Sequence, residues 1–147
     1  MAARIEDCPL ARAVDRIGDW RTLELLHETL NGVHDVRRMR DDLGLTAGAL
    51  RERLDAAVAA GLLAPHRDGY RPTDLGRSLR PLIAVLAAWG NRDLEPGRRA
   101  LILVDARTGQ EVEPVVVDRR TGRRVDTADH VFRAGPAAGP GLRSRYA

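Results

Sequence analysis

The chain has 147 residues, which is room for one ordinary domain or for a small domain with an appendage. All 24 basic residues are arginine, and the net charge of +3 is uneven: 14 arginines balance 14 acids in residues 1–94, whereas residues 95–147 hold 10 arginines and 7 acids. So small a basic excess is weak evidence for nucleic-acid binding. The single cysteine excludes an internal disulfide and a cysteine-built zinc site. No signal peptide or membrane-spanning run is recognisable, so we expect a cytoplasmic chain with no membrane partner.

The N-terminal part of the chain, as far as Gly61, is expected to be helical because its apolar residues recur at helical spacing. The predicted helices cover residues 9–17, 20–30, 33–42 and 46–61, the last capped by Thr46 after a tight turn at Gly44. Two short strands, 62–66 and 70–72, are predicted to form a hairpin through a turn at residues 67–69. Thr73 is expected to cap a long helix reaching about residue 92, in which Pro81 costs a hydrogen bond and favours a kink.

The composition changes beyond residue 94. β-branched segments at 101–104, 112–117, 125 and 131–132 are separated by T-G turns and predict short strands. The pattern V-D-x-R-T-G-x-x-V occurs twice among them, at 104–112 and 117–125. Residues 134–147 are rich in Gly, Pro and Ala without apolar periodicity, and this composition is typical of a flexible tail.

The order helix, turn, helix and two-stranded wing is that of a winged helix-turn-helix. We therefore expect the α+β class, with a mainly helical winged helix-turn-helix domain over residues 1–94, a small β-hairpin module over 98–133 and a flexible tail over 134–147. Such a domain binds double-stranded DNA, because the major groove admits one helix while the wing follows the backbone. Helix 46–61 is expected in the groove and the 66–71 wing on the backbone. The candidate DNA-binding residues are Arg37, Thr46, Gly48, Ala49, Arg51, Arg53, His66, Arg67 and Arg71. The alternative is that these residues only form the solvent-exposed faces of helices and do not bind DNA.

Four stretches resemble the HxlR-type winged-helix regulators of the wider MarR-like group. They are CPLARAVDRIGDWRTLELL, GLTAGALRERLDAAVAAGLL, YRPTDLGRSLRPLI and LAAWG, which together span residues 8 to about 92. The resemblance implies a bacterial transcription factor that binds inverted repeats as a homodimer, paired through the first and last helices of the domain. The chain departs from the family at Asp35-Val36, where Arg-Phe is usual, near Gly48, where a lysine is usual, and in its short wing. DNA affinity is therefore expected to be low for the family, or to depend on the arginine-rich C-terminal segment.

Two further features leave alternatives open. The resemblance places Cys8 where some family members carry a redox-sensing cysteine, and a helix N-terminus beside Arg12 would favour its thiolate; a half-buried structural cysteine is the alternative. A small-molecule effector also stays open. The second functional hypothesis is a small-molecule-binding protein on a winged-helix scaffold, with weak or lost DNA binding and an apolar pocket near Trp20 and Trp89.

Some HxlR-like proteins carry a C-terminal module similar to a zinc ribbon, and the repeated pattern is similar to its metal-binding knuckles. At the ligand positions this chain has Asp105 and Thr108, then Asp118 and Thr121, instead of Cys and His. These are poor zinc ligands, so we expect no metal and no cofactor. Instead the Asp and Thr side chains are expected to accept backbone N–H bonds within two turns, with a glycine after each at positive φ. No catalytic motif is recognisable, and the chain is not expected to be an enzyme.

Overall fold

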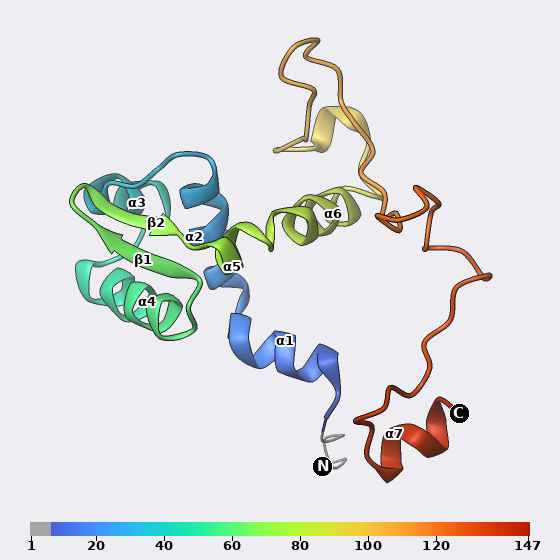
Figure 1. The fold of residues 1–147 in the computed structure, drawn as a ribbon. Coiled ribbons are helices and arrows are strands. Elements are labelled where there is room, and N and C mark those ends of the chain that lie inside the picture. The colour runs from blue at the N-terminus through green and yellow to red at the C-terminus, as the bar shows by residue number, and fades with distance from the viewer. Residues whose placement is uncertain (1–6) are drawn as a thin grey trace. The chain divides into compact units, whose positions relative to one another are not determined.

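The computed structural model describes residues 7–147 (Figure 1). They form two compact units: residues 19–114 make up one, and residues 7–18 together with 115–147 make up the other. The larger unit contains five helices, a short 3-10 turn and a two-stranded antiparallel sheet. The smaller unit contains α1 (Pro9–Ile17) and α7 (Pro140–Arg145). The predicted α+β class is therefore confirmed.

Each of the next three helices begins at a side chain that caps it. Asp19 accepts hydrogen bonds from the amides of residues 21 and 22 at the start of α2 (Trp20–Leu30). Asp35 accepts from Arg38 N at 2.9 Å before α3 (Val36–Asp42), and Thr46 Oγ1 accepts from Ala49 N at 3.2 Å before α4 (Ala47–Ala59). The expected start of α3 at residue 33 is wrong, because Asp35 takes the extended backbone of an N-cap.

The hairpin is fixed against the loop between α2 and α3. Strand β1 (Leu63–His66) pairs with β2 (Gly69–Pro72), and His66 opposite Gly69 leaves only residues 67 and 68 in the turn. Tyr70 N donates to the His34 carbonyl oxygen at 3.2 Å. Gly69 has φ of 126°, and a Cβ there would overlap that same carbonyl oxygen. Glycine is thus required at this position by both backbone conformation and space.

One hydrophobic core holds these elements together. It lies among α2, α3, α4 and the hairpin, with one residue each from the loops after α2 and after α4. Its buried side chains are Leu25, Leu26, Val33, Met39, Leu50, Leu54, Ala57, Leu62 and Leu63. Removing a leucine or methionine of this kind from water contributes about 1.5–3 kcal/mol each. The core fixes which face of α4 points inward and leaves the opposite face exposed.

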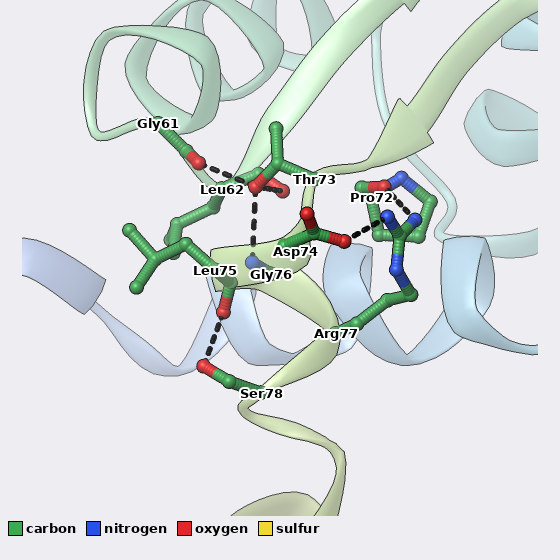
Figure 2. Close-up of polar contacts among 9 residues, drawn as sticks. All are labelled: Gly61, Leu62, Pro72, Thr73, Asp74, Leu75, Gly76, Arg77 and Ser78. Carbon is green, nitrogen blue, oxygen red and sulfur yellow. Dashed lines mark hydrogen bonds and ion pairs between the residues drawn. The ribbon is translucent and has the colours of Figure 1, made fainter.

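The long helix predicted from Thr73 to residue 92 is broken. It consists of α5 (Asp74–Arg77) and α6 (Arg80–Gly90), with Pro81 in the first turn of α6. Proline has no N–H to bond the carbonyl four residues earlier, so a continuous helix is disfavoured here and a new start is favoured. At the end of α5 the Ser78 hydroxyl donates to the Leu75 carbonyl at 2.6 Å (Figure 2).

Thr73 ties the start of α5 to the end of α4 (Figure 2). Its hydroxyl donates to the Gly61 carbonyl at 2.6 Å and accepts from Gly76 N at 3.1 Å, while its own amide donates to the Leu62 carbonyl at 3.0 Å. A Cβ on Gly76 would overlap the Leu62 carbonyl oxygen. The two segments therefore approach each other backbone to backbone.

The C-terminal strands predicted at 101–104, 112–117, 125 and 131–132 are not formed. After a 3-10 turn at Pro96–Arg98, the only pairings outside β1 and β2 in residues 7–147 are single bridges, Val104 with Glu111 and Val117 with Arg124. Isolated hairpins without a buried face are marginal in water, and the apolar side chains here are exposed. In the expected tail, residues 140–145 form α7. No helix in the described part of the chain is long and apolar enough to cross a membrane.

Candidate nucleic-acid interface

The exposed face of α4 begins at its N-terminal end. Leu50 and Leu54 point into the core, so the residues between and before them face outward. Thr46, Gly48 and Arg51 are exposed. Ala49 and Arg53 are partly buried at the edge of this face. The small residues at 47–49 leave room for a second molecule to approach the helix backbone closely.

Three of the predicted arginines keep their charge unpaired. Arg37 on α3 and Arg51 and Arg53 on α4 form no ion pair within residues 7–147. Their neighbours on α3 differ: Arg38 Nε lies 3.4 Å from an Asp42 oxygen, and Arg40 lies 2.8 Å from Asp41. Arg37, Arg51 and Arg53 are thus three candidate residues whose charge is available to an external anion.

The predicted wing residues share one carboxylate, which the sequence analysis did not single out. Asp68 Oδ2 lies 3.6 Å from His66 Nδ1, 3.4 Å from Arg67 Nε and 3.8 Å from a terminal nitrogen of Arg71. All four side chains are well exposed, so each pair contributes little to stability. From the sequence, Asp68 is expected only as part of the turn at residues 67–69. Its position between three cations is visible only once the register of the hairpin is known.

These groups belong to one compact unit. Helix α3 contacts α4, α4 contacts β1, and β1 pairs with β2. The candidate groove helix and the wing are therefore held in fixed relation by the same core. A cation-bearing helix face next to a cation-bearing hairpin is an arrangement that can bind a polyanion at several points.

The remaining candidates belong to other elements of the chain. Trp20 is 60 % exposed, with the Arg21 guanidinium carbon 5.2 Å from the centre of its ring, and Trp89 is 69 % exposed. Cys8 occupies the N-cap position of α1, is half-buried and makes no side-chain capping bond. Neither tryptophan lines the cavity of about 320 Å³ found in the larger unit.

The two repeated turns are closed by their own side chains, as predicted. Asp105 Oδ1 accepts from the amides of Arg107 at 2.8 Å and Thr108 at 3.0 Å, and Asp118 Oδ1 accepts from Arg120 N at 3.0 Å. The glycines that follow, at 109 and 122, have φ of 71° and 68°. Hydrogen bonds lower the pKa of both carboxyls. The carboxylate of Asp105 accepts from the backbone amides of Thr108 and Arg107. That of Asp118 accepts from the backbone amide of Arg120 and from the Thr121 hydroxyl. In residues 7–147 no three His, Cys, Asp or Glu side chains gather as a metal site.

Comparison with known proteins identifies relatives of the whole chain. No protein-family model matches the chain. Uncharacterised HTH-type transcriptional regulators of Mycobacterium tuberculosis (Rv3095) and Mycobacterium bovis (Mb3122) are 30% identical to it over 155 aligned positions, covering 100% of this chain and 96% of each relative.

Two solved structures share the fold. PA1374, described as a candidate transcription factor from Pseudomonas aeruginosa, superposes with a TM-score of 0.69 at 30% identity, covering 94% of this chain and 99% of the other. PA1607, described in the same way, gives a TM-score of 0.74 at 29% identity, covering 88% and 95%. With this identity over its whole length, the chain belongs to the HTH-type transcriptional regulators.

Proposed function

We propose that the protein is a sequence-specific DNA-binding regulator that acts as a homodimer, with α4 in the major groove and the 66–71 wing on the phosphate backbone. The observation that carries the proposal is the exposed N-terminal face of α4, where Arg51 and Arg53 have no ion-pair partner in the described residues while the wing stands beside them. Membership of a helix-turn-helix family supports it.

The side chains on this face suit distinct parts of a duplex. Arg51 can donate two parallel hydrogen bonds to a guanine edge or to a phosphate. Thr46 accepts from the helix amide, so its own hydroxyl hydrogen is free to donate to a phosphate oxygen. Gly48 and Ala49 allow close approach, and the Ala49 methyl can contact a thymine methyl group. Arg37, on α3, is placed to contact the backbone rather than the bases.

The wing is the weaker contributor in this proposal. Its three cations face one carboxylate, Asp68, which lies 3.4–3.8 Å from each of them. A fixed negative charge at the wing tip repels phosphate and offsets part of the attraction. A second acid, Asp35, stands where the HxlR-type regulators usually carry arginine. The two acids together predict a modest and strongly salt-dependent affinity for DNA.

A second copy of the chain is the proposed partner. On α6 the side chains of Leu82, Leu86 and Trp89 recur at helical spacing and are 41 %, 42 % and 69 % exposed. On α1, Leu10 and Val14 are one turn apart and also exposed. Apolar helix faces of this kind are usually covered by another chain, and a two-fold dimer covers the same face on both copies.

The finer family placement belongs to the same proposal. We assign the chain to the HxlR-type regulators on the motifs of residues 8–92, and we take residues 98–133 as a ribbon-like module whose turns use Asp and Thr where related modules use metal. Its arginines at 119, 120 and 123 give this module a basic edge for phosphate or a partner, whereas Arg124 pairs with Asp126. A cytoplasmic location follows from the proposed role.

Fluorescence anisotropy with a duplex from the upstream region of the protein's own gene tests DNA binding. At about 50 mM salt we expect saturable binding that weakens steeply as salt rises, because phosphate contacts release counterions. A random duplex of equal length should bind more weakly. If neither duplex binds at that salt, the DNA-binding proposal fails, and the small-molecule-binding alternative takes its place.

Sedimentation equilibrium tests the dimer. The wild-type chain should sediment at twice its 16.1 kDa mass. Leu86→Glu should shift it to the monomer, since a charge would be buried at the interface. Leu101→Glu is the matched control, because Leu101 is also exposed but lies outside α6. A wild-type monomer at micromolar concentration would contradict the proposal.

A further inference from the structure

A cavity of about 320 Å³ opens beside the wing, on the side of the hairpin that faces α2. Its walls come from the end of α2, the loop that follows it, strand β2 and the segment from α5 to the start of α6. This volume lies at the lower end of the range for small-molecule sites. All of its walls belong to one compact unit of the chain.

Three arginines line the cavity, and no acidic residue does. They are Arg71, Arg77 and Arg80. Arg80 forms no ion pair within residues 7–147 and donates to the Leu30 carbonyl at 3.4 Å. Each guanidinium carries five N–H donors, so each retains donors beyond the contacts that it makes inside the protein. The cavity lining therefore carries three positive charges and no negative charge, and of the three arginines only Arg71 and Arg77 pair with an acid among the described residues.

The acids that do pair with these arginines stand outside the cavity. Asp74 is 2.5 Å from Arg77, but its side chain is 99 % exposed, so water screens the pair. Asp68 is 3.8 Å from Arg71 and is also well exposed. An anion inside the cavity would meet less competition from water than these carboxylates do, because the walls exclude part of the solvent.

His34 adds an unsatisfied group to the same wall. It lines the cavity, and its Nδ1 is buried without a hydrogen-bond partner among the described residues. A buried polar nitrogen left unpaired costs free energy, and such an atom in a native structure calls for a partner. This nitrogen is itself buried, so the polar groups that the wall offers to a bound molecule are its guanidinium groups.

We propose that this cavity is the site of a small oxyanion effector, a compact molecule bearing a carboxylate or phosphate group, and that its occupation lowers DNA affinity. The guanidinium groups of Arg71, Arg77 and Arg80 form the recognition set. The coupling runs through Arg71, which lines the cavity and also belongs to the proposed wing. This regulatory part rests on the proposed DNA-binding function; the binding part does not.

The coupling has a simple physical origin. A guanidinium that donates to an anion in the cavity is turned away from DNA phosphate, and the bound negative charge lies next to the wing. Both effects disfavour DNA, and by linkage DNA disfavours the anion by the same factor. The bound anion is thus expected to act as an inducer that releases the protein from DNA.

Anion binding is measured first, on the full chain without DNA, by NMR titration with citrate and with inorganic phosphate at constant ionic strength. We expect saturable shifts centred on the amides of Arg71, Arg77, Arg80 and His34. Arg80→Gln should weaken binding at least tenfold, because one charge-assisted hydrogen bond is lost, whereas Arg80→Lys should retain part of it. Arg92→Gln, an exposed arginine outside the cavity, is the matched control. Shifts spread evenly over the surface, or equal affinity for Arg80→Gln and wild type, would overturn the site.

The effect on DNA is measured second, by anisotropy with and without citrate at fixed ionic strength. Wild type should lose at least fivefold in DNA affinity with citrate, and Arg80→Gln should lose none. Absence of DNA binding without citrate would refute the proposed function, yet it would leave the anion site standing on the NMR result. If Arg80→Gln alone weakens DNA binding as much as Arg51→Gln does, the cavity holds a DNA phosphate and the effector role is wrong.

Discussion

The helical body of residues 19–79 and the two turns at 105–109 and 118–122 are ordered in different ways. In the body, buried apolar side chains from α2, α3, α4 and the hairpin meet in one core, although they are distant in sequence. In the turns, order comes from the Asp and Thr of the turn itself, which bond to amides two or three residues away. The three valines before the second turn, at 115–117, remain 43–48 % exposed.

This difference predicts how far the effect of a substitution extends through the structure. A change in the body alters packing that every element shares, so its effect should be global and cooperative. A change in a turn removes one or two exposed hydrogen bonds, so its effect should stay within that turn. The exposed face of α4 depends on both kinds of order. A substitution there changes one local contact, but the core determines where that side chain lies.

The largest expected effect is that of Gly69→Ala. The new Cβ would overlap the His34 carbonyl oxygen, and the backbone φ of 126° is unfavourable for alanine. We expect a loss of about 3 kcal/mol or more in the free energy of unfolding, measured by urea denaturation. The control is Gly48→Ala, where a Cβ meets open space in a helix and stability should be unchanged or slightly higher. Equal stability of the two variants would contradict the close approach of hairpin and loop.

A smaller global effect is expected for Thr73→Val. Valine keeps the branched shape but loses the hydroxyl that joins the Gly61 carbonyl to the amide of Gly76. The expected loss is about 1–2 kcal/mol, read from the urea midpoint. Thr73→Ser retains the hydroxyl and should lose less than half as much. A valine variant as stable as wild type would show that this junction does not hold α5 in place.

Asp68→Asn should change DNA binding while leaving stability within about 0.5 kcal/mol, because the pairs it makes are exposed. Removing the carboxylate frees His66, Arg67 and Arg71, so DNA affinity should rise about threefold to tenfold with a steeper salt dependence. Asn-Gly also keeps a favourable hairpin turn. Asp93→Asn, an exposed acid outside the hairpin, serves as control. Unchanged affinity for Asp68→Asn would mean that the wing does not contact the backbone.

The smallest effect is expected in the turns, as a function of pH. Since the pKa of Asp105 and Asp118 is lowered, the carboxylates stabilise the turns fully above the usual Asp value of about 3.9 and lose that contribution as pH falls through the lowered pKa. NMR should show the amide shifts of Thr108 and Arg120 changing below pH 3.9, and Asp105→Asn should abolish only the first change. Turn amides that titrate at the usual pKa would contradict the hydrogen bonds.

The body could be predicted from sequence because each of its signals has a local cause. Apolar spacing predicted α2 and α4, and Thr46 and Thr73 were recognised as caps. The same reasoning overestimated the strands beyond residue 100, since β-branched residues favour strands only where a partner buries one face. The helix break at Pro81 was expected only as a kink.

The candidate DNA-binding residues of α4 can be predicted from the order of helices and strands in the sequence. Which charged residues form ion pairs cannot. Pairing of Asp68 with three wing residues depends on hairpin register, and the arginine-lined cavity joins residues from Thr29 to Arg80. Neither can be deduced from spacing along the chain. Distant residues that meet only through packing are the part of a site that sequence patterns miss.

The most direct test of DNA recognition by α4 compares Arg51→Gln with Arg92→Gln by anisotropy on the upstream duplex at about 50 mM salt. Arg51→Gln should lose roughly tenfold in affinity, because one base or phosphate contact of this kind is worth about 1–3 kcal/mol, and Arg92→Gln should bind like wild type. Both variants carry the same charge change, so a general electrostatic effect would weaken them equally. Equal affinities for the two variants would contradict the central claim.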